Sequence, residues 1–182
     1  VVMCFASPKL VTSLVTTHLP LFRVPRAVTR VSVARSILAL SELLSARSRR
    51  VPRIAVASLN PHAGEGELLG SEERTAIVPG IRIAARSLGK RAQVSGPLGA
   101  ETAYRKALAG DFDGVVAMYH DQATIPLKLL SFGTAVNVTM GLGITRTSVD
   151  HGTGYDIAWQ RKADASGMLA AMKLAKRLAS AR

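Results

Sequence analysis

Short apolar runs alternate with helical patterns along this chain, and that alternation constrains its fold more than any other feature. The runs expected to be strands are KLVTSLVTT, RIAVASL, AQVSG, GVVAM and AVNVTM. Helical patterns lie between and after them, over residues 26–46, 71–86, 101–109, 124–130 and 163–180. Strands that alternate with helices in this way predict an α/β protein, with three α/β/α layers around a largely parallel sheet.

Length, cysteine content and hydropathy set further limits. The 182 residues are enough to bury a sizeable core, and 48% of them are apolar. The single cysteine, Cys4, allows no internal disulfide, so a reducing, cytoplasmic location is expected. No stretch approaches the ~20 apolar residues of a membrane span. The chain starts without Met inside an apolar run that has no basic opening, so we expect it to begin in the middle of a larger protein.

Positive charge is concentrated in two places of a chain with a net charge of +12. The basic residues concerned are Arg47, Arg49, Arg50, Arg53, Lys173, Lys176, Arg177 and Arg182. One interpretation is a solvated face with cations placed favourably at helix C-termini. A nucleic-acid surface is the second, but with 4% aromatic residues few rings accompany these cations. A partner or domain outside this chain is the third.

Three of the four histidines follow predicted strands directly. His18 comes after KLVTSLVTT, His62 after RIAVASL and His120 after GVVAM. The carboxyl ends of parallel strands meet at one edge of a sheet, so the three imidazoles can converge there. Three neutral imidazoles with open positions would form a catalytic divalent-metal site, with Glu65 and Asp121 as carboxylates that orient the rings. The alternative for each histidine taken alone is an ordinary polar surface residue.

Six stretches together resemble a known family. They are LVTTHLPLFRVP, LNPHAGEGELLGSEE, GPLGAETAY, MYHDQATIPLKLL, AVNVTMGLGITRTSVDHGTGYDIA and KADASGMLAAMKLA. In this order and spacing they resemble the C-terminal half of the 4-hydroxythreonine-4-phosphate dehydrogenase family of vitamin B6 biosynthesis. The resemblance implies a fold like isocitrate and isopropylmalate dehydrogenases, incomplete here because the N-terminal half is absent. It also implies oxidation of 4-phosphohydroxy-L-threonine with decarboxylation to 3-amino-2-oxopropyl phosphate.

The resemblance also implies roles for individual residues. It makes His18, His62 and His120 the ligands of a divalent metal (zinc, magnesium or cobalt) that is shared across a homodimer. The implied substrate-binding residues are Lys128, Asn137 and Arg146, and the implied catalytic residues are Asp121, Lys128 and Glu101. Lysine and arginine are suited to this task because they bind phosphate and carboxylate through charge-assisted hydrogen bonds.

The nicotinamide cofactor, NAD or NADP, has no GxGxxG motif in this sequence. DHGTGYDIA is similar to the His-Gly loop of isopropylmalate and isocitrate dehydrogenases, which implies cofactor binding by His151, Gly152, Thr153 and Asp156. A tight glycine-flanked turn with a satisfied histidine is the alternative. The chain departs from the family pattern near this loop, at Gly143 and at residues 159–161, and it has Glu101 where the family more often has Asp.

The resemblance divides the chain into two parts. Residues 1–150 would form a metal-binding and dimerisation domain, and residues 151–182 would form the cofactor loop and a helix that returns to a first domain absent from this chain. The helix has an apolar face that needs a partner, made of Met168, Leu169, Met172, Leu174 and Leu178. Three readings stay open: the B6-pathway dehydrogenase, a paralogue acting on another phosphorylated hydroxy acid such as 4-phosphothreonate, and a catalytically silent dimeric fragment that only binds metal and anions.

Overall fold

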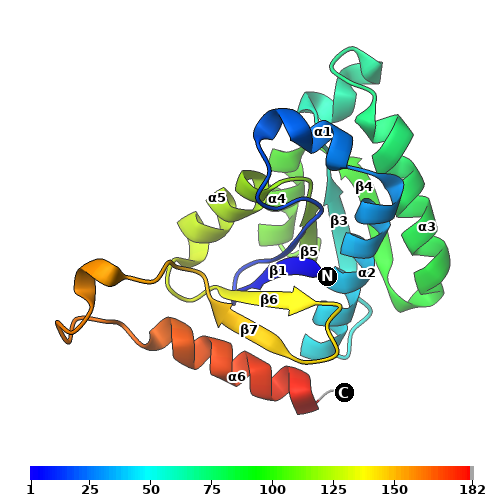
Figure 1. Ribbon diagram of the computed structural model, residues 1–182. Coiled ribbons are helices and arrows are strands. Elements are labelled where there is room, and N and C mark those ends of the chain that lie inside the picture. The colour runs from blue at the N-terminus through cyan, green and yellow to red at the C-terminus, as the bar shows by residue number, and fades with distance from the viewer. Residues whose placement is uncertain (181–182) are drawn as a thin grey trace.

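A computed structural model describes residues 1–180 and shows one seven-stranded sheet covered by helices on both faces (Figure 1). The strands are β1 (Val2–Ala6), β2 (Val11–Leu14), β3 (Arg53–Ala57), β4 (Gln93–Leu98), β5 (Gly114–Ala117), β6 (Val136–Met140) and β7 (Arg146–Val149). The helices are α1 (Val24–Ala27), α2 (Arg30–Arg47), α3 (Val78–Leu88), α4 (Ala100–Leu108), α5 (His120–Ser131) and α6 (Ser166–Ser180). The predicted three-layer α/β architecture is therefore confirmed.

The sheet has two halves that differ in strand pairing. Its order is β4-β3-β5-β2-β1-β6-β7, and the pairs among β4, β3, β5 and β2 are parallel. The pairs β2–β1, β1–β6 and β6–β7 are antiparallel. Because β6 runs in the same direction as β2, only β1 and β7 oppose the others, and the sheet is mostly parallel as predicted. The strands β1 and β7 themselves were not predicted.

Each face of the sheet has its own core. On one face, Ile37 and Leu40 of α2 are fully buried against β-strand residues such as Val56 and Val116, and Leu174 of α6 joins the same cluster. On the other face, Leu127 of α5 packs with Ala103 of α4 and with strand residues. Helices α2, α3 and α6 therefore form one outer layer, and α4 and α5 form the other.

Local sequence explains where α2 begins. The Thr29 hydroxyl accepts a hydrogen bond from the Ser32 amide at 3.1 Å, and the Ser32 hydroxyl accepts one from the Thr29 amide at 2.9 Å. This reciprocal capping box satisfies two amide donors that the first turn would otherwise leave free. Helix α5 begins earlier than the predicted residues 124–130, because His120 is already its first residue. Helix α6 begins at Ser166 rather than at residue 163.

The expected apolar face of α6 is only partly covered. Leu174 and Leu178 are buried and pack with the β6 and β7 side of the core. Met168, Leu169 and Met172 are more than half exposed. The return of this helix to a further domain stays a prediction. None of the helices within residues 1–180 has the length and apolar character needed to cross a membrane.

Gly80 allows α2 and α3 to approach closely, and we expect its replacement by alanine to destabilise the fold. A Cβ atom at Gly80 would lie 2.7 Å from the Val33 Cβ and 2.9 Å from the Arg30 carbonyl oxygen. Gly-to-Ala changes inside helices normally stabilise by about 0.5–1 kcal/mol. Here overpacking should reverse the sign, and the free energy of unfolding should fall by about 1–3 kcal/mol. Urea denaturation of Gly80→Ala measures this, and an increase in stability would contradict the close approach.

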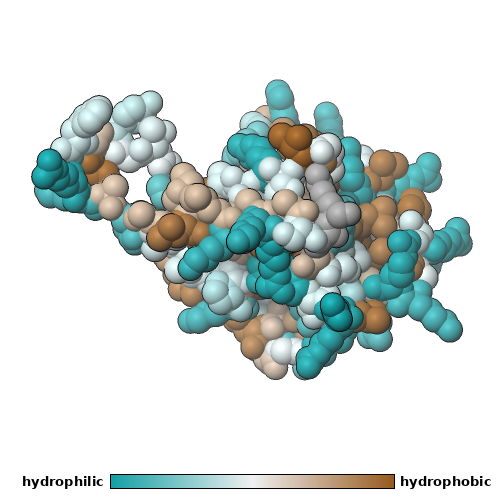
Figure 2. All heavy atoms as spheres, turned by 90° about the horizontal axis from the view of Figure 1, so that it is seen from below, coloured by the Kyte–Doolittle hydropathy of each residue, from teal (hydrophilic) through white to brown (hydrophobic). Residues whose placement is uncertain are grey.

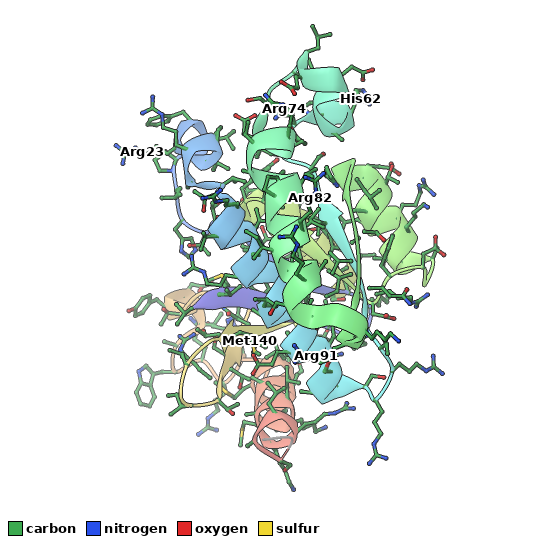
Figure 3. The ribbon with its side chains drawn as sticks, turned by 90° about the vertical axis from the view of Figure 1, so that its right-hand side faces the viewer. Arg23, His62, Arg74, Arg82, Arg91 and Met140 are labelled. Atoms are coloured by element: carbon green, nitrogen blue, oxygen red, sulfur yellow. The ribbon has the colours of Figure 1, made fainter. Side chains whose placement is uncertain are left out.

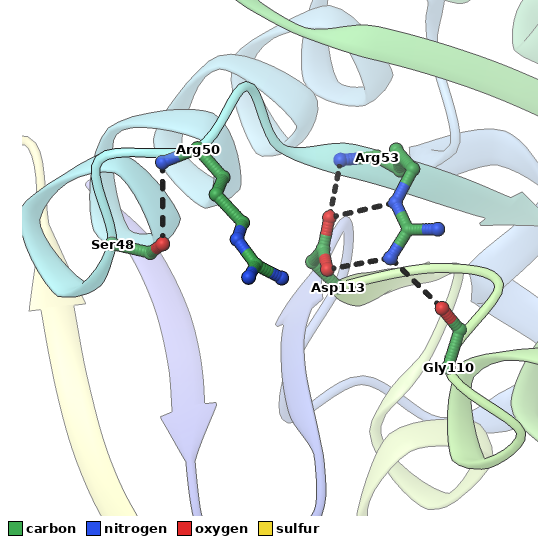
Figure 4. Close-up of polar contacts among 5 residues, drawn as sticks. All are labelled: Ser48, Arg50, Arg53, Gly110 and Asp113. Atoms are coloured by element: carbon green, nitrogen blue, oxygen red, sulfur yellow. Dashed lines mark hydrogen bonds and ion pairs between the residues drawn. The ribbon is translucent and has the colours of Figure 1, made fainter.

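Arg53 and Asp113 join the start of β3 to the start of β5 (Figure 4). Asp113 accepts hydrogen bonds from the Arg53 amide at 2.7 Å and from the Arg53 guanidinium at 3.0 and 3.2 Å. Burial by itself would raise the pKa of Asp113, but the side-chain and backbone hydrogen bonds from Arg53 together outweigh it and lower that pKa. The stabilisation is therefore present above the ordinary aspartate pKa of about 3.9 and is lost as the pH falls through the lower folded-state pKa.

We expect Asp113→Asn to lower the free energy of unfolding at neutral pH and to have a smaller effect in acid. Urea titrations of the wild type and the variant at pH ~7 and pH ~2.5 measure the difference, which should shrink at the lower pH as both chains become uncharged at this position. Asp111→Asn is the matched control, since this neighbouring acid acts on Arg53 only through its charge. A difference between wild type and Asp113→Asn that is the same at both pH values would contradict this account.

Candidate metal and substrate site

Two of the predicted metal ligands lie together at the carboxyl edge of the parallel strands. The rings of His18 and His120 have centroids 5.3 Å apart and planes inclined by 43°. Hydrogen bonds from the amides of Val15 and Thr16 to the carbonyls of Ala117 and Met118 extend the β2–β5 pairing past both strand ends. The segments that carry the two histidines are therefore held side by side.

The separation of the two rings fits a shared divalent ion. With metal–nitrogen bonds of about 2.0–2.1 Å, two imidazoles at a tetrahedral angle place their ring centres roughly 5 Å apart. His120 Nδ1 lies 2.7 Å from the Asp121 carboxylate, which as an anion accepts a hydrogen bond from the Nδ1–H group. This hydrogen bond leaves the Nε2 lone pair of His120 available to a ligand, in the way that carboxylates orient metal-binding histidines.

His62 stands apart from this pair. Within residues 1–180 no group of three or more His, Cys, Asp or Glu side chains is placed to hold a metal ion. Figure 3 shows His62 on the projecting loop η2 (Pro61–Glu67), where its side chain is exposed. The structure therefore brings together two of the three histidines within one chain, and the role of His62 stays a prediction.

The loop that carries His62 has an unusual backbone held by a buried acid. Residues 62–66 all have positive φ values between 44° and 86°, a conformation that costs energy for residues other than glycine. Glu73 is buried and accepts hydrogen bonds from the amides of Leu59 and Asn60 and from the Asn60 side chain, at 2.8–2.9 Å. Gly64 passes so close that an added Cβ would lie 3.0 Å from the Glu73 carboxylate.

Gln122 connects the two strand ends that carry His62 and His120. Its side-chain oxygen accepts from the Met118 amide at 2.7 Å, and its side-chain nitrogen donates to the Ser58 carbonyl at 2.8 Å. Ser58 directly follows β3, and Met118 directly follows β5. The side-chain amide of Gln122 therefore holds the ends of β3 and β5 together, a role that the sequence did not reveal.

The predicted substrate-binding residues share one face of the sheet. Asn137 on β6 pairs with Phe5 and with Ser148, and Arg146 on β7 pairs with Thr139. Phe5 belongs to the core beneath α5, so these side chains lie on the face that α5 covers. Lys128 is exposed on α5, seven residues after Asp121 and hence on the same side of the helix.

Arg146 and Glu101 already have partners within the chain. Arg146 Nη1 donates to the Thr139 hydroxyl at 2.8 Å. Glu101 lies in the first turn of α4, shortly after β4, and accepts hydrogen bonds from Thr102 and Arg105, which lower its pKa. The Glu101 carboxylate is therefore ionised and engaged with its own helix in this structure.

Buried acceptors on β6 and directly after β7 lack donors among the described residues. The Asn137 side-chain oxygen and both carboxylate oxygens of Asp150 are buried without a hydrogen-bond partner. A buried carboxylate without a donor is costly, so a ligand that can donate would be favoured here. The sequence analysis did not single out Asp150, although it lies in RTSVDHGT, because one acid in a motif gives no sign of its burial.

The predicted cofactor residues lie on an exposed segment. Figures 1 and 2 show residues 150–165 projecting from the body of the molecule. His151 Nδ1 lies 2.8 Å from the Gly152 carbonyl, and Gly154 has a left-handed backbone. Thr153 and Asp156 are exposed. The geometry is compatible with the tight glycine-flanked turn and with a cofactor loop, and it does not bring these residues to the two histidines.

Comparison with known proteins identifies relatives that match almost the whole chain. Residues 1–175 match the family model for pyridoxal phosphate biosynthetic protein PdxA. The chain is 49% identical over 174 residues to 4-hydroxythreonine-4-phosphate dehydrogenase of Desulfosudis oleivorans, covering 95% of this chain and 51% of that protein. It is 50% identical over 179 residues to the enzyme of the same name from Geobacter metallireducens, covering 98% and 52%. The chain thus spans about half the length of these relatives.

Solved structures agree with the sequence comparison. A crystal structure of 4-hydroxythreonine-4-phosphate dehydrogenase from Klebsiella pneumoniae matches with a TM-score of 0.85 at 40% identity, covering 98% of this chain and 53% of that one. A terephthalate 1,2-cis-dihydrodiol dehydrogenase from Burkholderia xenovorans matches with a TM-score of 0.77 at 31% identity, covering 97% and 55%. The same architecture is therefore found in proteins named for different substrates.

Glu73→Ala should release the loop that carries His62. The change leaves three donors at Leu59 and Asn60 without their acceptor, so we expect the free energy of unfolding to fall by about 2–4 kcal/mol. Hydrogen exchange of the Leu59 and Asn60 amides should also become faster. Glu72→Ala is the control, because Glu72 accepts only from the Asn60 side chain. Equal losses in the two variants would contradict the special role of Glu73.

Proposed function

The chain belongs to the pyridoxal phosphate biosynthetic protein PdxA family, and from this premise we propose that it carries the metal and substrate site of a 4-hydroxythreonine-4-phosphate dehydrogenase. The reaction would be the NAD- or NADP-dependent oxidation of 4-phosphohydroxy-L-threonine. In this reaction the substrate carbinol would lose a hydride to the bound cofactor and its hydroxyl proton to a base. The carboxylate would then leave as CO₂, and the α-carbon would take up a proton to give 3-amino-2-oxopropyl phosphate. The observation that carries the proposal is the His18–His120 pair with its Asp121 hydrogen bond.

The protein residues have separate tasks in this proposal. His18 and His120 would hold a zinc, magnesium or cobalt ion, and Asp121 would keep the His120 ring in the required tautomer. When bound, such an ion supplies Lewis acidity, which stabilises negative charge on the reacting oxygen during oxidation and decarboxylation. Lys128 and Arg146 would bind the phosphate and carboxylate groups by charge-assisted hydrogen bonds. Lys128 and Glu101 would also take part in proton transfer in this proposal.

Asn137 and Asp150 suggest why an amino acid would be the substrate. Both present buried oxygens without donors among the described residues. Asn137 lies on the face that also carries Arg146, and Asp150 directly follows β7. A substrate ammonium group and hydroxyl groups can donate hydrogen bonds to such oxygens, whereas phosphate and carboxylate groups cannot. 4-Phosphothreonate also has hydroxyl donors, but only the amino acid has a cationic ammonium group that can pair with the buried Asp150 carboxylate, and this favours a phosphorylated hydroxy-amino acid. The cofactor would contact His151, Gly152, Thr153 and Asp156.

A homodimer would complete the metal site in this proposal. Helix α5 and the residue that follows it expose an apolar stripe at Ile125, Leu129 and Phe132, with relative exposures of 58%, 83% and 76%. Exposed apolar residues in a row mark a protein contact surface. A second copy packed against this stripe could bring its own His62 to the pair of histidines. The proposed location is the cytoplasm, and neither nucleic acid nor membrane is a proposed partner.

Zinc titration of the purified chain tests this proposal, with sedimentation to report its oligomeric state. We expect a dimer that binds one zinc ion per chain, and His120→Ala and His62→Ala should each lose stoichiometric binding. Asp121→Asn should bind about 10–100-fold more weakly, as removal of a hydrogen bond behind a ligand usually does. Leu129→Glu should give a monomer that also loses zinc, although all three histidines remain.

Two further measurements separate the possible outcomes. Ile83→Glu places the same charge on an exposed apolar position of α3 and should leave both dimer and zinc intact. Formation of reduced cofactor from 4-phosphohydroxy-L-threonine, compared with 4-phosphothreonate, reports activity and substrate choice. Zinc binding without turnover of either substrate would make this chain a metal-binding module. Full zinc affinity in His62→Ala, or in monomeric Leu129→Glu, would refute the shared site.

A further inference from the structure

Basic residues that are far apart in the sequence surround one large cavity. The cavity has a volume of about 1020 Å³ and lies between the last turns of α2 and α3, the β6–β7 connection and the end of α6. Figure 3 shows Arg91 after α3 and Met140 at the end of β6 beside one another above α6. Among residues 1–180, five arginines line it, namely Arg47, Arg49, Arg91, Arg146 and Arg177, and Glu42 is the one acidic residue of the lining. The two basic clusters of the sequence thus meet here.

The arginines of this cavity have neutral partners. Arg47 Nη2 donates to the Ser7 carbonyl at 3.2 Å, and Arg177 donates to the Arg47 carbonyl. Arg91 donates to the carbonyls of Ser87 and Leu88 at 2.7 and 3.3 Å. By contrast, Arg53 at the end of the same basic run is neutralised by Asp113 (Figure 4). The ion pairs found among the described residues all lie outside the cavity.

The burial of Arg47 makes this accumulation of charge costly. Desolvation, followed by the nearby charge of Arg177, lowers the pKa of the Arg47 guanidinium. Glu42 lines the cavity but forms no ion pair with Arg47 or Arg177 among the described residues, so two neighbouring cations without a paired carboxylate destabilise the folded chain unless an anion is present. Hydroxyl groups of Ser41, Ser45 and Ser48 also line the cavity and can donate to anionic oxygens.

We propose that this cavity binds a small polyanion with at least two phosphate groups. Guanidinium groups match phosphate oxygens with pairs of parallel hydrogen bonds, and the volume is at the upper end of the range for small-molecule sites. The lining contains no aromatic residue on which a nucleic-acid base could stack. The predicted metal ligands do not line the cavity, and Arg146 alone belongs to both residue sets. The inference therefore goes beyond the proposed function and does not depend on it.

Isothermal titration of the 182-residue chain with inorganic pyrophosphate and with orthophosphate tests the proposal. Pyrophosphate should bind at least about tenfold more tightly than orthophosphate, since it can reach more than one arginine. Arg177→Gln, an exposed position that should leave folding intact, is expected to weaken pyrophosphate binding at least about tenfold. Arg47→Gln should do the same.

A control variant distinguishes specific binding in the cavity from general attraction between the basic chain and an anion. Arg82→Gln removes the same charge from an exposed position on α3 outside the cavity and should leave the affinity for pyrophosphate unchanged. Equal affinities for the two anions, or equal losses in Arg82→Gln and Arg177→Gln, would overturn the proposal. Binding of an oligoglutamate peptide without binding of pyrophosphate would also overturn it, and would make the cavity a surface for an acidic protein segment.

Discussion

The parallel pairing of β3, β5 and β2 is the constraint on which the candidate site depends. Hydrogen bonds between these strands fix where the chain leaves the sheet, and the pairing continues past β2 and β5 as far as Thr16 and Met118. Gln122 then ties the end of β5 to the end of β3. Because these segments are fixed by backbone bonds in the protein interior, His18 and His120 can be held at a metal-binding separation without direct bonds between their rings.

Strand ends and residue types could be predicted from the sequence, but burial and pairing could not. The positions of His18 and His120 followed from short apolar runs, because a parallel sheet places all carboxyl ends at one edge. The antiparallel strands β1 and β7 were missed, since VMCFA and RTSV do not alternate with helices and one of them is largely polar. Periodicity also placed the start of α5 too late, because His120 and Asp121 are polar residues that no apolar pattern includes.

Long-range electrostatics explains the other differences between sequence and structure. The basic run near Arg47 and the basic helix near Arg177 are separated by about 130 residues, and nothing local indicates that they meet. Likewise the sequence shows that Asp113 and Arg53 have opposite charge, but only the β3–β5 pairing makes them partners. The sequence of the basic run by itself therefore favours a solvated face. In the folded chain, Arg53 of this run forms an ion pair with Asp113, whereas Arg47 and Arg49 line the cavity without a carboxylate partner in the part of the chain that the structure describes.

The β6–β7 ribbon borders two polar regions of opposite chemical character. Asn137 lies on β6 and Asp150 directly follows β7, and both present hydrogen-bond acceptors without donors among the described residues. The end of the ribbon borders the arginine cavity, where Arg47, Arg91 and Arg177 donate to neutral carbonyl oxygens and have no carboxylate partner within residues 1–180. Unpaired acceptors favour a ligand that donates, and unpaired guanidinium groups favour an anion. Since the two requirements are chemically opposite, a single charged group cannot satisfy both, which argues for two separate subsites on the two sides of this ribbon.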